Sequence, residues 1–107
     1  MTNFSLLVLR ARNIETTANF YRALGFEFTS EQHGNGPQHF ACERDGFVLE
    51  IYPLRSNQTE VNDSVMLGFR VTSLEVLPFA VEIKDGPPRF ASVRDPDGRV
   101  VRLEETT

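Results

Sequence analysis

The chain has 107 residues, a formal net charge of −4, 40% hydrophobic and 24% charged residues. These values are ordinary for one small soluble domain. Lys84 is the only lysine, and nucleic-acid binding requires clustered basic side chains. No apolar run approaches the ~20 residues of a membrane span. We therefore expect neither a nucleic-acid partner nor a membrane partner.

Two further features of the sequence bear on the compartment in which we expect the protein. The single cysteine, Cys42, cannot form an internal disulfide, which fits a reducing compartment. The first residues lack the charge and apolar block of a signal peptide, so we expect a cytoplasmic protein. A chain this short leaves much surface uncovered, and we expect a homodimer.

The first half of the sequence predicts the order strand, helix and three strands. Asn13 offers a side-chain oxygen to the first free N–H groups of a helix over 15–24, and Gly25 is a typical helix end. Turn signals rich in Gly, Asn and Pro separate the extended segments that follow. The predicted strands are residues 4–11, 26–30, 38–43 and 47–52.

The second half repeats this order with a much shorter helix. Only 73–77 is available for a helical turn before Pro78 prevents its continuation. Strands are predicted at 79–84, 89–93 and 99–104. We expect a single domain over 1–107, with module one at 1–54, a linker at 55–62 and module two at 63–107.

The two halves also share residues at fixed offsets. An offset of 60 pairs Arg10 with Arg70 and the cap Asn13 with Ser73. An offset of 52 pairs residues 45–51 with residues 97–103, so the second copy is eight residues shorter, the difference between the offsets. In a duplicated unit, equivalent positions of the two copies tend to face what the duplication encloses.

Three segments together carry a family resemblance. They are Asn13 to Glu15 after the first strand, Phe20 to Phe26, and Arg94 to Gly98 before the last strand. In this order they resemble the vicinal oxygen chelate superfamily, which includes glyoxalase I, fosfomycin-resistance enzymes, extradiol dioxygenases and bleomycin-resistance proteins. The resemblance implies an α+β fold of two βαβββ modules, the second with a truncated helix. The modules would pair around a cleft, within one chain or between two.

The resemblance also implies where a metal would bind. Superfamily members with a metal hold it with residues on the first and fourth strands of each module. Those positions become Leu6, Glu50, Met66 and Arg102 here. Only Glu50 could bind a hard divalent ion, since leucine has no donor, a thioether prefers soft metals and arginine is cationic. We therefore expect no metal and no cofactor at this site.

Strand alternation suggests what takes the place of the metal. Val48, Glu50 and Tyr52 share one strand face, and the repeat places Arg102 on the corresponding face of module two. We expect Glu50 and Arg102 to form an ion pair in a cleft beside Leu6 and Met66. The alternative is a cleft that has closed into a core or a dimer seam.

Other candidate ligand-binding residues come from the same strands. Arg10 and Arg70 have the strand parity of Leu6 and Met66, and two guanidinium groups could hold a carboxylate or phosphate. Alternatively these arginines pair with surface acids such as Glu15 and Glu75. Phe40 and Tyr52 are candidates for the pocket wall or for the core. His33 is expected to be solvated, and His39 has no recognisable catalytic neighbour.

Three functions remain open at this point. The first is a metal-free homodimer of the bleomycin-resistance type that sequesters a small molecule, for which the acidic balance favours a cation. The second is an enzyme: a glyoxalase-type lyase or isomerase, or a dioxygenase-like enzyme, with a displaced metal site, or an isomerase with Glu50 as general base. The third is an interaction module without a ligand.

Overall fold

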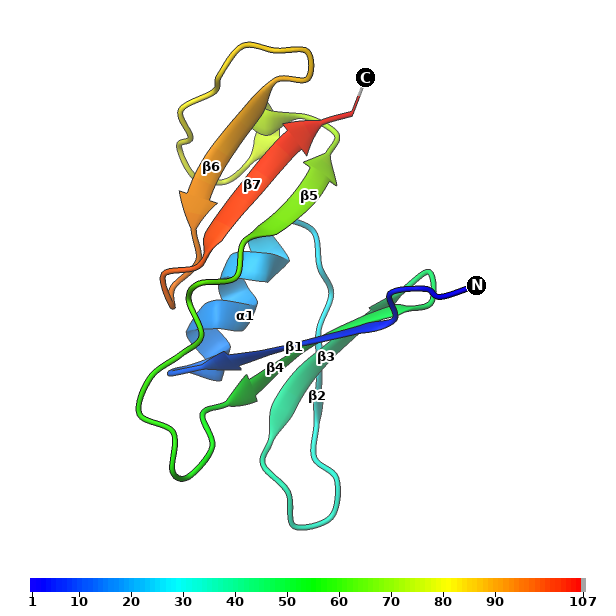
Figure 1. Ribbon diagram of the computed structural model, residues 1–107, viewed down its shortest axis with the longest axis vertical. Helices are drawn as coiled ribbons and strands as arrows, with labels where there is room; N and C mark the ends of the chain where they lie inside the picture. Colours follow the sequence, from blue (N-terminus) through cyan, green and yellow to red (C-terminus); the bar gives the residue numbers. More distant parts are fainter. Residues whose placement is uncertain (107) are drawn as a thin grey trace. The chain divides into compact units, whose positions relative to one another are not determined.

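The computed structural model describes residues 1–106 and consists of two compact units, Met1–Val61 and Asn62–Thr107 (Figure 1). Each unit has one sheet, with four strands in the first unit and three in the second. The fold is α+β, as predicted. No helix among residues 1–106 has the length and apolar character that a membrane crossing requires.

The first unit follows the predicted order of elements. These are β1 (Leu6–Ala11), α1 (Ile14–Ala23), β2 (Thr29–Glu31), β3 (His39–Arg44) and β4 (Phe47–Pro53). In the sheet order β1-β4-β3-β2, β1 is parallel to β4 and the other pairs are antiparallel. Asn13 caps α1 as predicted, because its Oδ1 accepts a hydrogen bond from the Thr16 N–H at 3.1 Å.

The core of the first unit lies on one face of this sheet. α1 packs against β1, β3 and β4, and Tyr21 of α1 is fully buried together with Leu49 and Ile51 of β4. Each fully buried Leu or Ile side chain stabilises the fold by about 1.5–3 kcal/mol. The residues that alternate with them, Glu50 and Tyr52, are only partly buried and lie on the other face.

The repeat of one strand, a helix and three strands predicts four strands in the second unit, and the structure has three. Its elements are β5 (Leu67–Val71), the short 3₁₀ helix η1 (Leu74–Val76), β6 (Phe90–Arg94) and β7 (Val100–Glu105), with sheet order β5-β7-β6. The predicted strand at 79–84 is wrong, since this segment makes only one bridge, between Lys84 and Phe90. Pro87 and Pro88 in the connection have no N–H to extend the pairing.

The register of the parallel strands confirms the internal repeat. Leu7 of β1 pairs with Leu49 of β4, and Leu67 of β5 pairs with Val101 of β7. These pairs are related by the offsets of 60 and 52 found in the sequence. Ser73 also caps η1 as Asn13 caps α1. The two units are therefore built on the same strand pairing.

A buried ionic cluster holds the turn before β7. Arg99 is almost fully buried and its Nη1 lies 3.1 Å from Asp95 Oδ2 and 3.7 Å from Asp97 Oδ2. Asp95 Oδ1 also accepts the backbone N–H groups of Asp97 and Arg99. The Asp-Pro-Asp-Gly motif therefore stabilises the fold of the second unit, in addition to turning the chain.

Candidate ligand-binding site

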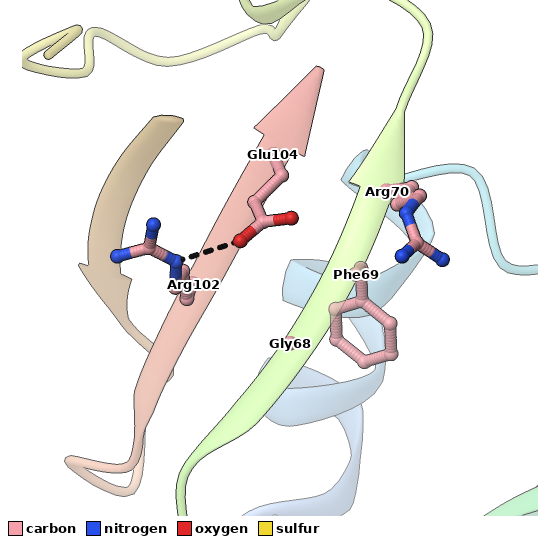
Figure 2. Close-up of a pocket in the computed structure, with 5 residues that line it drawn as sticks. All are labelled: Gly68, Phe69, Arg70, Arg102 and Glu104. Atoms are coloured by element: carbon pink, nitrogen blue, oxygen red, sulfur yellow. Dashed lines mark hydrogen bonds and ion pairs between the residues drawn. The ribbon is translucent and has the colours of Figure 1, made fainter. Parts of the chain in front are cut away.

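A pocket of about 230 Å³ lies on the sheet of the second unit (Figure 2). Its lining residues come from β5 and β7 and are Gly68, Phe69, Arg70, Arg102 and Glu104. Gly68 is paired with Arg102, and Arg70 with Glu104, so these four residues share one face. A Cβ at Gly68 would lie 4.0 Å from the Arg102 carbonyl oxygen, an ordinary van der Waals contact. The missing side chain therefore leaves room beside Arg102.

Arg102 is held in place by two neighbours on this face. Its guanidinium carbon lies 3.8 Å from the centroid of the Phe90 ring, and its Nε donates a hydrogen bond to Glu104 Oε1 at 3.0 Å. A cation over an aromatic face and a charge-assisted hydrogen bond both restrict the side chain. The guanidinium is therefore pre-oriented, and its bond to Glu104 uses the Nε–H group.

Arg70 is exposed and forms no ion pair with any other residue among 1–106. The alternative pairing with Glu75 is wrong, because Glu75 Oε1 accepts a hydrogen bond from Arg89 Nη2 at 2.8 Å. The pocket therefore combines two guanidinium groups with one carboxylate, that of Glu104. Its local charge is positive although the chain as a whole is acidic.

A second hollow of about 540 Å³ adjoins the first through shared residues. Arg70 and Glu104 line both. The remaining lining residues of the second hollow are Pro87, Pro88, Glu105 and Thr106. A ligand larger than the first pocket would therefore find further surface beside Arg70.

On the first unit, Arg10 and Tyr52 lie together. The Arg10 guanidinium carbon is 4.8 Å from the centroid of the Tyr52 ring, and Nη1 donates a hydrogen bond to the Pro53 carbonyl at 3.1 Å. Burial raises the pKa of the Tyr52 phenol, and the nearby Glu50 carboxylate raises it further, whereas Arg10 lowers it. Arg10 therefore contacts Tyr52 and Pro53 of its own unit.

No protein-family model and no curated protein matches this sequence. Solved structures do match it. A glyoxalase-related enzyme from Fulvimarina pelagi is 20% identical with a TM-score of 0.71, covering 99% of this chain and 89% of that chain. An antibiotic binding protein from a Streptomyces species is 20% identical with a TM-score of 0.69, covering 100% and 98%. A lactoylglutathione lyase from Agrobacterium tumefaciens is 17% identical with a TM-score of 0.64, covering 98% and 94%.

The chain has the vicinal oxygen chelate fold. At these identities the likeness shows the fold alone, so the chemistry has to come from the residues of this chain. Three of the four positions that the resemblance assigned to a metal carry residues that do not suit a divalent cation. Leu6 has no donor atom, Met66 offers a thioether, and the Arg102 guanidinium is bonded to Glu104.

The predicted ion pair between Glu50 and Arg102 joins residues of different units, and it stays a prediction. Within the described units, Arg102 is bonded to Glu104, and Glu50 Oε2 lies 3.7 Å from His39 Nε2. Phe40 does not share the face of Glu50. It pairs with Ile51 and is buried under Arg22 of α1, 4.9 Å from the ring centroid. Phe40 therefore belongs to the core, as the alternative had it.

One group of polar side chains was missed by the sequence analysis. Glu31, His33 and His39 place ligand atoms within 4.8 Å of one another. The signal that could have found them is the hairpin register, which pairs Glu31 with His39. His33 was correctly expected to be exposed, but its contact with Glu31 was not foreseen.

Proposed function

We propose that this vicinal oxygen chelate domain binds a small organic anion in the pocket of the second unit, without a metal at the four superfamily positions. The observation that supports this most is the presence of two arginines, Arg70 and Arg102, against one carboxylate, Glu104. Guanidinium groups bind carboxylates and phosphates through two parallel hydrogen bonds. The net charge of the chain favoured a cation, but the charge at the pocket itself favours an anion.

The fixed position of Arg102 supports binding further. A side chain already held by Phe90 and Glu104 loses little rotamer freedom when a ligand arrives. The similar Streptomyces protein is described as antibiotic binding, which is a precedent for small-molecule binding on this fold. An interaction module without a ligand is less well supported, since the pocket beside Gly68 is open.

The proposed assembly is a homodimer. β1 is an edge strand, and Phe4, Leu6 and Val8 in and before it are exposed by 71%, 52% and 37%. An apolar edge strand is a favourable surface for pairing with a second chain. Covering it would also add burial to a small domain.

Three probes of equal shape test the charge preference. Benzoate is an anion, benzamide is neutral and benzamidine is a cation. Binding is measured by ligand-observed saturation-transfer NMR and by calorimetry. We expect benzoate to bind more tightly than benzamide, and benzamidine to bind least. Preference for benzamidine would contradict the proposal.

Substitution of one pocket arginine tests whether benzoate binds in the pocket of the second unit. Arg70→Gln removes a charge that no other described residue pairs, so the pocket loses attraction without leaving a carboxylate unpaired. We expect the free energy of benzoate binding to weaken by about 1.5–3 kcal/mol, the scale of a hydrogen bond to a charged group. Arg55→Gln, at an exposed arginine of the first unit, is the matched control. Equal loss in both variants would contradict the assignment of the pocket.

A second candidate function is an enzyme with a displaced metal site. The observation that favours it is the group of Glu31, His33 and His39 beside Glu50. The test is turnover of the hemithioacetal of methylglyoxal and glutathione, with and without added Zn²⁺. Metal-dependent turnover that is lost in Glu50→Gln would support this function, and no turnover would exclude this substrate.

A further inference from the structure

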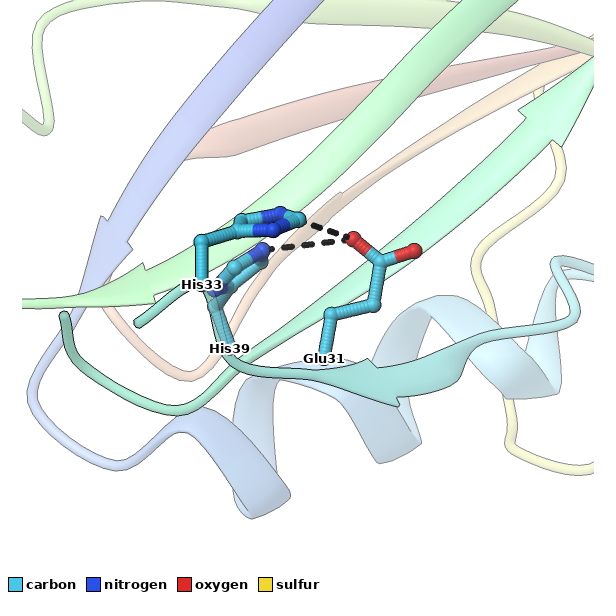
Figure 3. A group of neighbouring side chains, drawn as sticks. All are labelled: Glu31, His33 and His39. Atoms are coloured by element: carbon cyan, nitrogen blue, oxygen red, sulfur yellow. Dashed lines mark ion pairs between the residues drawn. The ribbon is translucent and has the colours of Figure 1, made fainter. Parts of the chain in front are cut away.

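The hairpin between β2 and β3 gathers one carboxylate and two imidazoles (Figure 3). Glu31 ends β2 and His39 begins β3, and the two residues are paired across the strands. Directly opposed residues of an antiparallel pair have neighbouring side chains on the same face. His33 lies in the connecting loop, and its ring centroid is 5.1 Å from that of His39. Figure 3 shows both rings directed toward one oxygen of Glu31.

The tautomer of His39 follows from a contact with the backbone. Its Nδ1 lies 3.1 Å from the Pro37 carbonyl oxygen, which can only accept a hydrogen bond. Nδ1 therefore carries a hydrogen, and in the neutral ring the lone pair is on Nε2. A histidine that binds a metal commonly donates its other ring N–H in this way, which fixes the ring orientation.

The Nε2 atom of His39 is buried and has no hydrogen-bond partner. The side chain is only 1% exposed, and Nε2 lies 3.4 Å from Glu31 Oε1 and 3.7 Å from Glu50 Oε2. Two carboxylate oxygens and a nitrogen lone pair are all acceptors, so their approach is unfavourable without a positive species among them. A metal cation or a proton on Nε2 would meet this requirement.

The separations fit a metal ion. Glu31 Oε1 lies 3.4 Å from His39 Nε2 and 3.5 Å from His33 Nε2. With metal–ligand distances of about 2.0–2.1 Å, two ligand atoms of a tetrahedral zinc site are about 3.3–3.5 Å apart. Two of the three distances between ligand atoms therefore already have the required length. The third, between the two imidazoles, lies within 4.8 Å and requires at most a small rotation of the exposed His33.

The loop is ordered by its own hydrogen bonds and leaves an approach from solvent. The Gly36 N–H donates to the His33 carbonyl at 2.9 Å, and the Gln32 Nε2 donates to the Gly36 carbonyl at 2.9 Å. The His33 side chain is 73% exposed and that of Glu31 is 38% exposed, whereas His39 is buried. A cation could therefore enter past His33 and meet a fixed ligand below it.

We propose that Glu31, His33 and His39 bind a divalent first-row transition metal of the zinc type. Two imidazoles and one carboxylate are a donor set that suits zinc and leave a fourth position for water or for the Glu50 carboxylate. None of its three ligands occupies one of the four superfamily metal positions, and only the candidate fourth ligand, Glu50, is shared with them. The metal site lies in the first unit, and the proposed anion pocket lies in the second. The experiments on one proposal therefore do not decide the other.

Cobalt and zinc titrations of the untagged protein, first dialysed against a chelator, test the proposal. Tetrahedral coordination of Co²⁺ by imidazole gives visible absorption bands, and calorimetry gives the affinity and stoichiometry for Zn²⁺. We expect about one ion per chain and displacement of the cobalt bands by zinc. Absence of both signals would overturn the proposal.

The ligands are assigned by variants at exposed or half-exposed positions, which preserve the buried histidine. His33→Ala and Glu31→Gln are each expected to weaken Zn²⁺ binding by at least about tenfold. Glu43→Gln, on the same hairpin but at an exposed position of β3, is the matched control and should bind as the wild type does. Unchanged affinity in His33→Ala and Glu31→Gln would overturn the assignment of the site.

Discussion

The imidazole of His39 stacks on the ring of Tyr52, with the ring centroids 4.0 Å apart and the planes 10° from parallel. His39 lies on β3 and Tyr52 on β4, so the contact crosses the sheet between adjacent strands. Together with the Pro37 carbonyl, the stack fixes the direction in which Nε2 points. The orientation of His39 is therefore set by the sheet and by its own loop, before any cation is bound.

The first prediction concerns this stack. Tyr52→Phe keeps the ring, whereas Tyr52→Leu removes it and leaves Arg10 without an aromatic face. Stacked aromatic pairs contribute about 0.5–1.5 kcal/mol beyond their burial. We expect Tyr52→Leu to lower the free energy of unfolding by about that amount more than Tyr52→Phe. Urea unfolding measures the difference, and equal stability of the two variants would rule out a contribution from the stack.

The second prediction concerns the buried arginine of the second unit. Arg99→Met removes the cation that faces Asp95 and Asp97 and leaves two buried carboxylates without it. Removing one partner of a buried ion pair costs about 3–5 kcal/mol. Arg55→Met, at an exposed position, should change the free energy of unfolding by less than about 0.5 kcal/mol. Similar unfolding midpoints in urea for both variants would contradict the role of Arg99.

The third prediction is a pH dependence. Two hydrogen bonds from Arg89 and one from the Leu74 N–H favour the carboxylate form of Glu105 and lower its pKa from 4.5 to about 2. Because the folded pKa is depressed, the stabilisation is fully present above pH 4.5 and is lost as the pH falls toward 2. We therefore expect the stability difference between wild type and Glu105→Gln to shrink over this window.

Urea unfolding of both proteins at pH values from about 7 down to about 3 measures this difference. Glu43→Gln is the control, since this exposed carboxylate of β3 has no ion pair among residues 1–106. Its difference from wild type should stay nearly flat across the same pH range. A wild-type advantage over Glu105→Gln that grows at low pH would contradict the assigned sign.

The fourth prediction tests the homodimer. Leu6→Glu places a charge on the exposed apolar edge strand and should produce a monomer in sedimentation velocity, while the wild type sediments with twice the mass of one chain. Val76→Glu changes an even more exposed apolar residue, in the second unit, and should remain dimeric. A monomeric wild type at all concentrations would refute the dimer.

Much of the fold could be predicted because it depends on local chemistry and on repetition. Asn13 and Ser73 were identified as caps from their residue type alone, and both cap a helix. The offsets of 60 and 52 predicted equivalent strands, whose register is the same in both units. The strand expected at 79–84 failed because alternation of side chains does not show whether a neighbouring strand is available for pairing.

The candidate sites were harder to predict, because their residues meet through pairing that the sequence does not display. Arg102 was assigned to a strand face, yet its hydrogen bond to Glu104 was overlooked in favour of a partner in the other module. The contact of Glu31 with His39 depends on the length of one hairpin loop. A shift of one residue in that register would move His39 to the opposite face.

A backbone amide NMR titration with sodium benzoate tests the anion site on the second unit. In the wild type we expect the largest shifts at Gly68, Arg70 and Arg102. In Arg70→Gln we expect the shifts of Gly68 and Arg102 to require at least about tenfold more benzoate. Saturable shifts confined to the first unit, or the same response in Arg70→Gln, would contradict the proposed site.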